Sequence, residues 1–315
     1  MEAGHVPVMV DEVMQALAPQ PDSLQIDGTL GGGGHAVRIL EAISPGGKLL
    51  GLDADPAAIE RARLRLAPYG DRAVLRQANF EELAALASGN GFDPADGLLL
   101  DLGLSSNQLA DEARGFSFRA AGALDMRFDP SRGEPASALL ERLDERGLAA
   151  LFRRYGEEPF AGRIARAIVE ARERAPLASA AALADVIEGA VPPFRPAGRR
   201  RVHPATRVFQ ALRIAVNREL EVLETVLAAG LQLLRPGGRI VVLTYHSLED
   251  RVVKRFIAAE RRGCVCPPEV PVCVCGRSPR LRVVPGTPAT PSQDEVASNP
   301  RSRSARLRAA ERLAA

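Results

Sequence analysis

Long apolar runs are missing from this chain of 315 residues. No stretch reaches the roughly 18 apolar residues that a membrane-spanning helix needs. The first residues, MEAGHVPVMVDEVM, carry acidic side chains and have neither the basic nor the apolar segment of a secretory signal. With 46% hydrophobic residues, the chain still has enough apolar side chains for a large core. We therefore expect a globular cytoplasmic protein with no membrane partner.

Cysteine is absent except in one short segment, CVCPPEVPVCVC. Four clustered thiols are not the disulfide framework of a small secreted protein. Three interpretations are open: two C-x-C pairs bind zinc, the thiols form disulfides, or they stay reduced without a ligand. The C-x-C spacing is tighter than the usual C-x₂₋₄-C of zinc sites, so we expect reduced thiols and no metal. The four residues are Cys264, Cys266, Cys273 and Cys275.

Lysine is also scarce, since Lys48 and Lys254 are the only two among 41 basic residues. A GC-rich genome explains an arginine bias but does not explain how the charge is distributed. Residues 195–315 hold 22 Lys/Arg and 10 Asp/Glu, a net of +12, whereas residues 1–194 hold 19 and 29, a net of −10. Arginine forks suit phosphate, so the basic part of the chain favours a polyanionic partner.

Two basic segments are candidates for phosphate contacts. One is Arg199–Arg201, and the other is the tail NPRSRSARLRAAERL, residues 299–313. We expect the tail to be a flexible basic arm or a helix lying on the core. Contacts of this kind weaken steeply as salt is added.

Short apolar runs alternate with helical periodicity over the first hundred residues, which is typical of a doubly wound parallel sheet. The fourth run, DGLLLDLG, is apolar on both faces, as a buried parallel strand should be. Strands are predicted within residues 23–30, 46–55, 72–80 and 96–103, and helices at 35–43, 56–70 and 81–88.

The alternation stops after this point and resumes near the end of the chain. Residues 109–206 contain no convincing strand, and a long helix is predicted at 206–234, before a buried strand at 239–246. Shorter helices are predicted at 143–155, 159–173 and 181–191. We expect a discontinuous α/β domain of residues 1–108 and 207–315, with an inserted helical domain of residues 109–206 for substrate recognition.

Four consecutive glycines, Gly31–Gly34, connect the first predicted strand to a helix. Such a turn directs backbone N–H groups and a helix N-terminus at a ligand. Asp27 precedes the turn, and Asp53 ends the second strand, where an acid typically binds ribose hydroxyls. No Gly-Lys-Ser/Thr follows, which argues against an NTPase, and GTLGGGG matches the dinucleotide fingerprint poorly. Dinucleotide and S-adenosylmethionine sites share this layout.

Other candidate residues follow the fourth strand. Asp101 ends that strand, where side chains line the site of a doubly wound fold, although it could simply cap the next turn. Phe116 and Phe118 stand out because only 4% of residues are aromatic. They are either a platform for an unstacked base or an anchor in the core.

A dozen motifs together resemble the bacterial small-subunit ribosomal RNA (cytosine-N4)-methyltransferase family, called RsmH or MraW. The resemblance covers nearly the whole chain. In chain order the motifs are HVPVMVDEV, DGTLGGGGHA, GLDADPAAI, ANF, DGLLLDLGLSSNQL, RGFSF, LDMRFD, YGEE, RIARAIV, HPATRVFQALRIAVNREL, LTYHSLEDRVVKRF and NPRSRSARLR.

The resemblance implies a class I, Rossmann-like fold with an inserted all-helical domain. It implies S-adenosylmethionine-dependent methylation of the exocyclic N4 of one cytidine in the decoding centre of 16S rRNA. The partner would be the small ribosomal subunit, and a homodimer is left open. The cofactor contacts that the family implies are Gly33, Gly34, His35, Asp53, Phe80, Asp101 and Gln108.

Three mild departures from the family pattern stand beside these matches. The family usually has a side chain, often Arg, where Gly32 stands, Phe where Tyr245 stands, and often Met where Phe128 stands. None removes an implied cofactor contact, although Gly32 could loosen the loop.

The chemistry leaves the catalytic group open. The lone pair of the cytosine N4 is delocalised, so an acceptor for the amine hydrogens would help, and Asp101 is the first candidate. His246 and Asp125 come after it. Two rival functions use the same features: an NAD(P)-dependent oxidoreductase on the same fold, and a non-catalytic RNA-binding factor that carries zinc on the cysteines.

Overall fold

A computed structural model describes residues 7–119, 122–192, 203–267, 269, 272 and 274–314. Arg199–Arg201 and Cys273 lie outside these residues. The chain divides into two compact units, Met1–Gly103 with Leu220–Ala315, and Leu104–Glu219. In the part of the chain that is described, no helix is long and apolar enough to cross a membrane.

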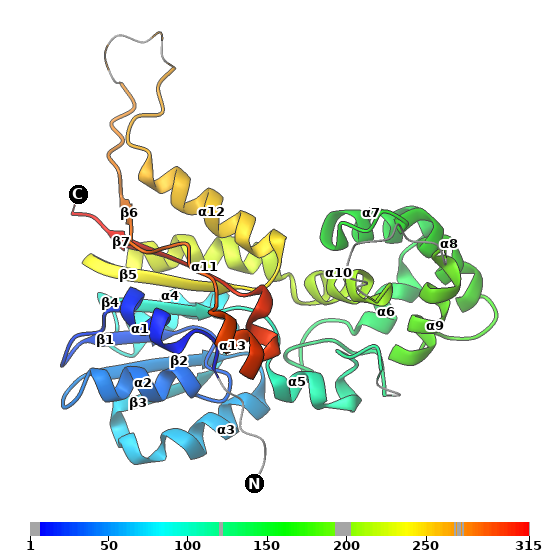
Figure 1. The fold of residues 1–315 in the computed structure, drawn as a ribbon, viewed down its shortest axis with the longest axis horizontal. Helices are drawn as coiled ribbons and strands as arrows, with labels where there is room; N and C mark the ends of the chain where they lie inside the picture. Colours follow the sequence, from blue (N-terminus) through cyan, green and yellow to red (C-terminus); the bar gives the residue numbers. More distant parts are fainter. Residues whose placement is uncertain are drawn as a thin grey trace. The chain divides into compact units, whose positions relative to one another are not determined.

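The first unit is built on one mixed sheet of seven strands (Figure 1). Its strand order is β3-β2-β1-β4-β5-β7-β6, in which β1 to β5 pair in parallel and β7 runs antiparallel to both neighbours. This is the class I, Rossmann-like fold that the resemblance implies. The strands are β1 (Leu24–Asp27), β2 (Lys48–Asp53), β3 (Ala73–Gln77), β4 (Ala95–Asp101), β5 (Leu234–Thr244), β6 (Leu281–Val283) and β7 (Arg306–Arg312).

Helices cover both faces of the sheet, which explains why the central strands are apolar throughout. In β4, Leu98 and Leu100 pack into one hydrophobic cluster while Leu99 packs into the other, because successive side chains point to opposite faces. One face carries α1 (Val10–Leu17), α2 (Gly34–Ala42) and α3 (Pro56–Leu66), and the other carries α4 (Leu83–Gly89), α11 (Glu219–Leu233) and α12 (Ser247–Arg261).

The basic tail is not a flexible arm, and only Pro300–Ser304 form a helix, a short 3₁₀ helix, so the expectation is wrong for the residues that follow. Residues Arg306–Arg312 form β7 inside the sheet, paired with β5 and β6. Leu307 and Ala309 are buried, whereas the guanidinium group of Arg308 binds Asp250 of α12 at 2.6 and 3.1 Å. Arginine alternates with apolar residues in R-L-R-A. This alternation has the period of a strand and could have predicted β7 from the sequence.

The second unit is helical, and its described residues show strand-like pairing only at one isolated bridge, between Ala123 and Ser179. Its core is formed by Phe152, Ile164, Ile187 and Leu212, among others. The three shorter predicted helices are confirmed as α7, α8 and α9. The helices are α5 (Ser106–Ala110), α6 (Ala136–Arg142), α7 (Glu145–Gly156), α8 (Ala161–Arg172), α9 (Ala180–Ala190) and α10 (Ala205–Asn217).

The single long helix predicted at 206–234 is two helices. The chain breaks at Arg218, whose φ of 51° is left-handed, between α10 and α11. The division between the two units falls one residue later. Because the apolar periodicity continues through the break, the sequence pattern does not reveal it.

Candidate functional site

Three aspartates end three neighbouring parallel strands of the first unit. Asp27 ends β1, Asp53 ends β2 and Asp101 ends β4, and β1 lies between the other two. The carboxyl ends of parallel strands are where ligands bind in open α/β sheets. Asp27 is 2% exposed, whereas Asp53 and Asp101 are half-buried. The acids that lie far apart in the sequence therefore come together where the parallel strands end, and this carboxyl end of the sheet is the edge referred to below.

The glycine turn lies at the same edge and is tied to the second strand. The N–H of Gly31 donates to Oδ2 of Asp53 at 2.7 Å, and the N–H of Asp55 donates to Oδ1 at 2.9 Å. Gly31 and Gly33 have left-handed φ values of 53° and 76°, which glycine adopts without a steric penalty. Gly33 is also the N-cap of α2.

The four glycines differ in what a side chain would meet. A Cβ on Gly33 would lie 3.5 Å from Leu66 of α3, and one on Gly34 would lie 3.0 Å from Pro7. A Cβ on Gly31 or Gly32 would meet nothing nearer than 3.9 Å. The backbone is thus open to a ligand at residues 31 and 32, while Gly33 and Gly34 are needed for conformation and packing.

The hydroxyl of Tyr245 holds the carboxylate of Asp101, and the ring of His35 lies near the other carboxylate oxygen. The Tyr245 hydroxyl donates to Oδ1 of Asp101 at 2.7 Å, and Nδ1 of His35 lies 3.6 Å from Oδ2. Nε2 of His35 is 2.9 Å from the carbonyl oxygen of Val8. Since a carbonyl only accepts, Nε2 carries the hydrogen of that bond. The backbone N–H of Asp101 donates to Oγ1 of Thr29 at 2.5 Å.

Burial changes the acidity of this cluster. It raises the pKa of Asp27 from 3.8 to about 7, although the charge of His35 and the N–H of Thr29 act the other way. It likewise raises the pKa of Asp53 from 3.8 to about 6 against the two backbone hydrogen bonds. Burial, followed by the charge of Asp101, raises the pKa of Tyr245 well above 10, so its hydroxyl remains a donor. Asp27 is therefore about half protonated at pH 7.

Phe80 follows β3 at this end of the sheet. It begins a short 3₁₀ helix, Phe80–Glu82, is half-buried, and packs against the cluster that contains Leu50 and Leu83. The backbone N–H of Ala78, two residues earlier, donates to the carbonyl oxygen of Asp53 at 3.0 Å. Phe80 thus follows directly from a point where the chain is bonded to the end of β2.

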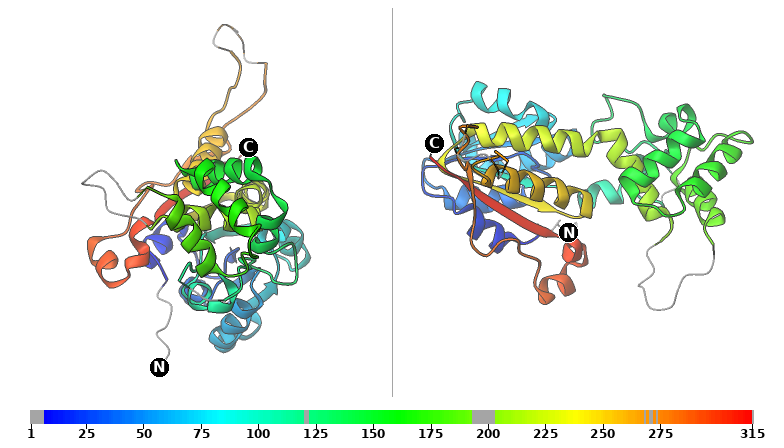
Figure 2. Two further views of the ribbon diagram at one scale, coloured as in Figure 1. Left: turned by 90° about the vertical axis from the view of Figure 1, so that its right-hand side faces the viewer. Right: turned by 90° about the horizontal axis from the view of Figure 1, so that it is seen from above.

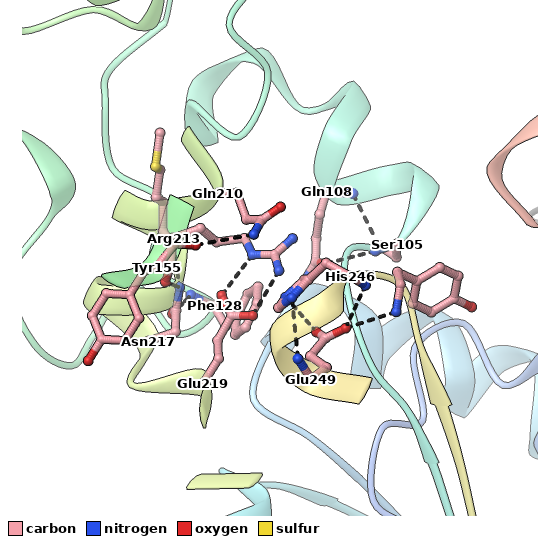
Figure 3. Close-up of polar contacts among 12 residues, drawn as sticks. Ser105, Gln108, Phe128, Tyr155, Gln210, Arg213, Asn217, Glu219, His246 and Glu249 are labelled. Carbon is pink, nitrogen blue, oxygen red and sulfur yellow. Dashed lines mark hydrogen bonds and ion pairs between the residues drawn. The ribbon is translucent and has the colours of Figure 1, made fainter. Parts of the chain in front are cut away.

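Gln108 belongs to the second unit, where it forms a capping box with Ser105 (Figure 3). Its Oε1 accepts the N–H of Ser105 at 3.0 Å, and Oγ of Ser105 accepts the N–H of Gln108 at 3.2 Å. These bonds satisfy N–H groups at the start of α5, which have no partner within the helix.

His246 is part of a second capping box, at the start of α12. Its Nδ1 accepts the N–H of Glu249 at 3.4 Å, and Oε2 of Glu249 accepts the N–H groups of Tyr245 and His246 at 2.8 and 3.3 Å. Glu249 is 2% exposed. The motif YHSLED therefore orients the helix that follows Tyr245.

The aromatic pair of the second unit is held by protein contacts. Phe116 is 6% exposed and stacks on Phe128, which makes it a core residue and not a base platform. Phe118 stacks on the ring of His203 at a centroid distance of 4.1 Å and meets Phe209 edge to face. The interpretation of Phe116 as a stacking platform is wrong because its ring is needed by the core.

Two polar clusters support the loop around Phe128 and the end of α10 (Figure 3). Asn217 accepts the N–H of Phe128 and donates to the carbonyl of Met126, both at 2.8 Å. Arg213 donates to both carboxylate oxygens of Glu219 at 2.7 and 2.9 Å. Within the same unit, Asp125 is engaged by Arg127 at 2.7 and 2.9 Å. Asp125 therefore has a structural ion-pair partner.

Three contributors to the site were not found from the sequence. Thr29 and Val8 look like ordinary strand-end and N-terminal residues, and Tyr245 stands out only as a departure from the family pattern. Thr29 is two residues from Asp27, which is the one local signal. The other two contacts join residues that are far apart in the chain.

A family model and close relatives show which family the chain belongs to. The model of the MraW methylase family matches residues 2–313. The ribosomal RNA small subunit methyltransferase H of Thermomicrobium roseum is 54% identical over 100% of this chain and 95% of that protein. The enzyme of the same name from Geotalea uraniireducens is 53% identical over 98% of both chains. An rRNA methylase from Streptococcus thermophilus, solved by crystallography, aligns over 97% of this chain and 94% of that chain with 11% identity and a TM-score of 0.44. The chain belongs to the MraW methylase family.

Proposed function

We propose that this protein transfers a methyl group from S-adenosylmethionine to the exocyclic N4 of a cytidine in the decoding centre of 16S rRNA, within the small ribosomal subunit in the cytoplasm. The observation that carries the proposal is the edge where Asp27, Asp53 and Asp101 meet the turn at Gly31 and Gly32. Relatives about half identical over their full length are named as small-subunit rRNA methyltransferases.

The residues at this edge fit the implied cofactor. Each oxygen of Asp53 accepts one backbone N–H, and a carboxylate oxygen has a second lone pair for a ribose hydroxyl. The open backbone at Gly31 and Gly32 suits the methionine portion, and the half-buried ring of Phe80 suits the adenine. When bound, S-adenosylmethionine would supply an electrophilic methyl group on a sulfonium.

The role of Asp101 follows from its hydrogen bonds. The Tyr245 hydroxyl orients its carboxylate, the ring of His35 lies 3.6 Å from the other carboxylate oxygen, and Thr29 fixes its backbone N–H. A carboxylate held in this way accepts hydrogens from an amine and favours a pyramidal nitrogen with its lone pair free. Positioning of this kind supplies a large part of the rate in transfer reactions. The proton can leave after transfer, so the proposal requires no separate base.

Recognition of the RNA is assigned to the helical unit, as an inserted substrate-binding domain of about residues 109–206. The strongly basic C-terminal part of the chain adds phosphate contacts, though Arg308 is already used by Asp250. The target base must be exposed or flipped out of its stack, which costs a few kcal/mol when it is stacked. Because these phosphate contacts release counterions, affinity for the subunit should fall steeply as salt rises.

The first test is calorimetric titration of the intact protein with S-adenosylmethionine, with NADH as the rival cofactor. We expect binding of S-adenosylmethionine alone. Asp53→Asn should weaken it about 10- to 150-fold, the equivalent of losing roughly 1.5–3 kcal/mol of hydrogen bonding to a charged group. Asp11→Asn is the matched control, because its side chain is 82% exposed on α1. Binding of NADH, or an unaltered affinity in Asp53→Asn, would contradict the proposal.

The second test is methyl transfer to small subunits that lack the modification. Digestion of the 16S rRNA to nucleosides should give N4-methylcytidine at one decoding-centre position, identified by chromatography and mass spectrometry. A methyl group on cytosine C5, on a ribose or on another position would refute the specific assignment while leaving the enzyme class intact.

A further inference from the structure

The cysteine segment is the part of the chain that the proposed function does not use. It lies between the end of α12 at Arg261 and the start of β6 at Leu281, and it leaves the sheet as a long excursion (Figures 1 and 2). Val265 and Val274 are 52% and 81% exposed, so apolar burial of these side chains does not stabilise the segment. Its described residues form no helix or strand, and a loop of this length is uncommon in a compact domain. Some other interaction is needed to give it a defined conformation.

The described thiols of this segment converge. The sulfur atoms of Cys264, Cys266 and Cys275 all lie within 4.8 Å of one another, and those of Cys264 and Cys275 are 3.8 Å apart. A tetrahedral zinc site with Zn–S bonds of about 2.3 Å has sulfur atoms about 3.8 Å apart along each edge. A disulfide would require about 2.05 Å between sulfurs. The 3.8 Å between the sulfur atoms of Cys264 and Cys275 is thus too long for a disulfide, and it equals both the edge of a zinc–thiolate tetrahedron and the length of an S–H···S hydrogen bond.

Backbone N–H groups point at all three sulfurs. Cys266 N–H faces the sulfur of Cys264, Val265 N–H faces that of Cys275, and Val274 N–H faces that of Cys266, each at 3.4 Å. Hydrogen bonds from N–H groups stabilise the thiolate, which is the form that binds metal. Such partners orient metal ligands and tune the site. The two halves of the excursion therefore bond to each other's sulfur atoms.

The tight C-x-C spacing favours reduced thiols without a metal, but because the sulfur atoms converge we propose instead that Cys264, Cys266 and Cys275 bind a structural Zn²⁺ ion that links the two sides of the excursion. Thiolates in tetrahedral arrangement select zinc among the common divalent ions. A closed structural site takes four ligands, of which the described thiols supply three, and the sequence has a further cysteine, Cys273, in the same segment. Since none of the described residues of the segment is buried, metal binding supplies the free energy that orders it. The inference does not depend on the identity of the methyl acceptor.

The test uses the intact protein, purified under reducing conditions without a chelator. Elemental analysis should find one zinc per chain, and replacing zinc by Co²⁺ should produce the visible absorption bands of tetrahedral thiolate-bound cobalt. Cys264→Ser and Cys275→Ser should each weaken zinc binding more than about 100-fold, beyond the cost of losing an outer hydrogen-bond partner. Val265→Ser is the matched control, because it changes an exposed side chain of the same segment and keeps its N–H.

Several results would overturn the proposal. These are reduced protein that takes up no zinc at micromolar concentrations, iron in place of zinc, a disulfide among the thiols after isolation, or serine variants that bind zinc like the parent. Cobalt titration of the unaltered chain needs no variant, so a variant that fails to fold does not obscure the answer. Titration with S-adenosylmethionine in parallel separates this test from the proposed function: we expect the same affinity in Cys264→Ser.

Discussion

Replacing Asp27 by asparagine should change how stability depends on pH. Asp27 is 2% exposed, and burial raises its pKa from 3.8 to about 7. Asparagine has the same shape, keeps an oxygen to accept the N–H of Thr29, and cannot become charged. The substitution therefore isolates the cost of burying a charged carboxylate at the end of β1.

The sign and size follow from the pKa difference. Because the folded protein holds the proton more tightly than the unfolded chain, the stability that Asp27 contributes is fully present below about pH 4. It is lost as the pH rises to about 7. Between pH 5 and pH 8 the loss is about 2–3 kcal/mol, at 1.36 kcal/mol for each of roughly two pKa units. Relative to the parent, Asp27→Asn should thus gain about 2–3 kcal/mol at pH 8 compared with pH 5.

Urea unfolding at the two pH values measures this difference. Circular dichroism is the suitable probe, since the chain has no tryptophan. Asp53 also titrates in this range but is present in both proteins, so its contribution largely cancels. In the control Asp11→Asn, the stability difference from the parent should be the same at both pH values. If the stability difference between Asp27→Asn and the parent is also the same at both pH values, folding does not raise the pKa of Asp27.

Two further sets of variants test the glycine turn and the Asp101 network. Gly33→Ala should lower the free energy of unfolding by about 1–2 kcal/mol, because its φ of 76° is left-handed. Gly32→Ala should raise it by about 0.4–1 kcal/mol, since its φ lies outside that region and its Cβ would have room. Thermal unfolding compares the pair, and equal stability of the two variants would contradict the conformational reason. Tyr245→Phe should cost about 1.5–3 kcal/mol by removing the hydrogen bond to Asp101; denaturant titration showing no loss would mean that this bond contributes nothing.

Much of the site was predictable because it lies at the ends of regular elements. Apolar runs of strand length, each followed by an aspartate, predict where β1, β2 and β4 end, and parallel pairing then brings Asp27, Asp53 and Asp101 to one edge. The glycine turn is a local signal for the same reason. Periodicity also indicated the helical stretch that separates the two parts of the α/β unit.

Other features depended on contacts with residues that are distant in the chain, which a local sequence pattern does not indicate. The tail becomes β7 because β5, more than 60 residues earlier, offers an open edge for pairing. Arg218 breaks a continuous apolar pattern, and Phe116 is buried because the helical core needs its ring.

Sequence alone thus determined the alternating strands and helices from β1 to β4, the glycine turn and the acids at the strand ends, since hydrophobic periodicity and backbone freedom act over a few residues. Tertiary structure decided the hydrogen bond from Tyr245 to Asp101, the burial that raises the pKa of Asp27, and the convergence of Cys264 and Cys275. Each of these depends on the distance between atoms, or on their exclusion from water, and the chain acquires both only when it packs.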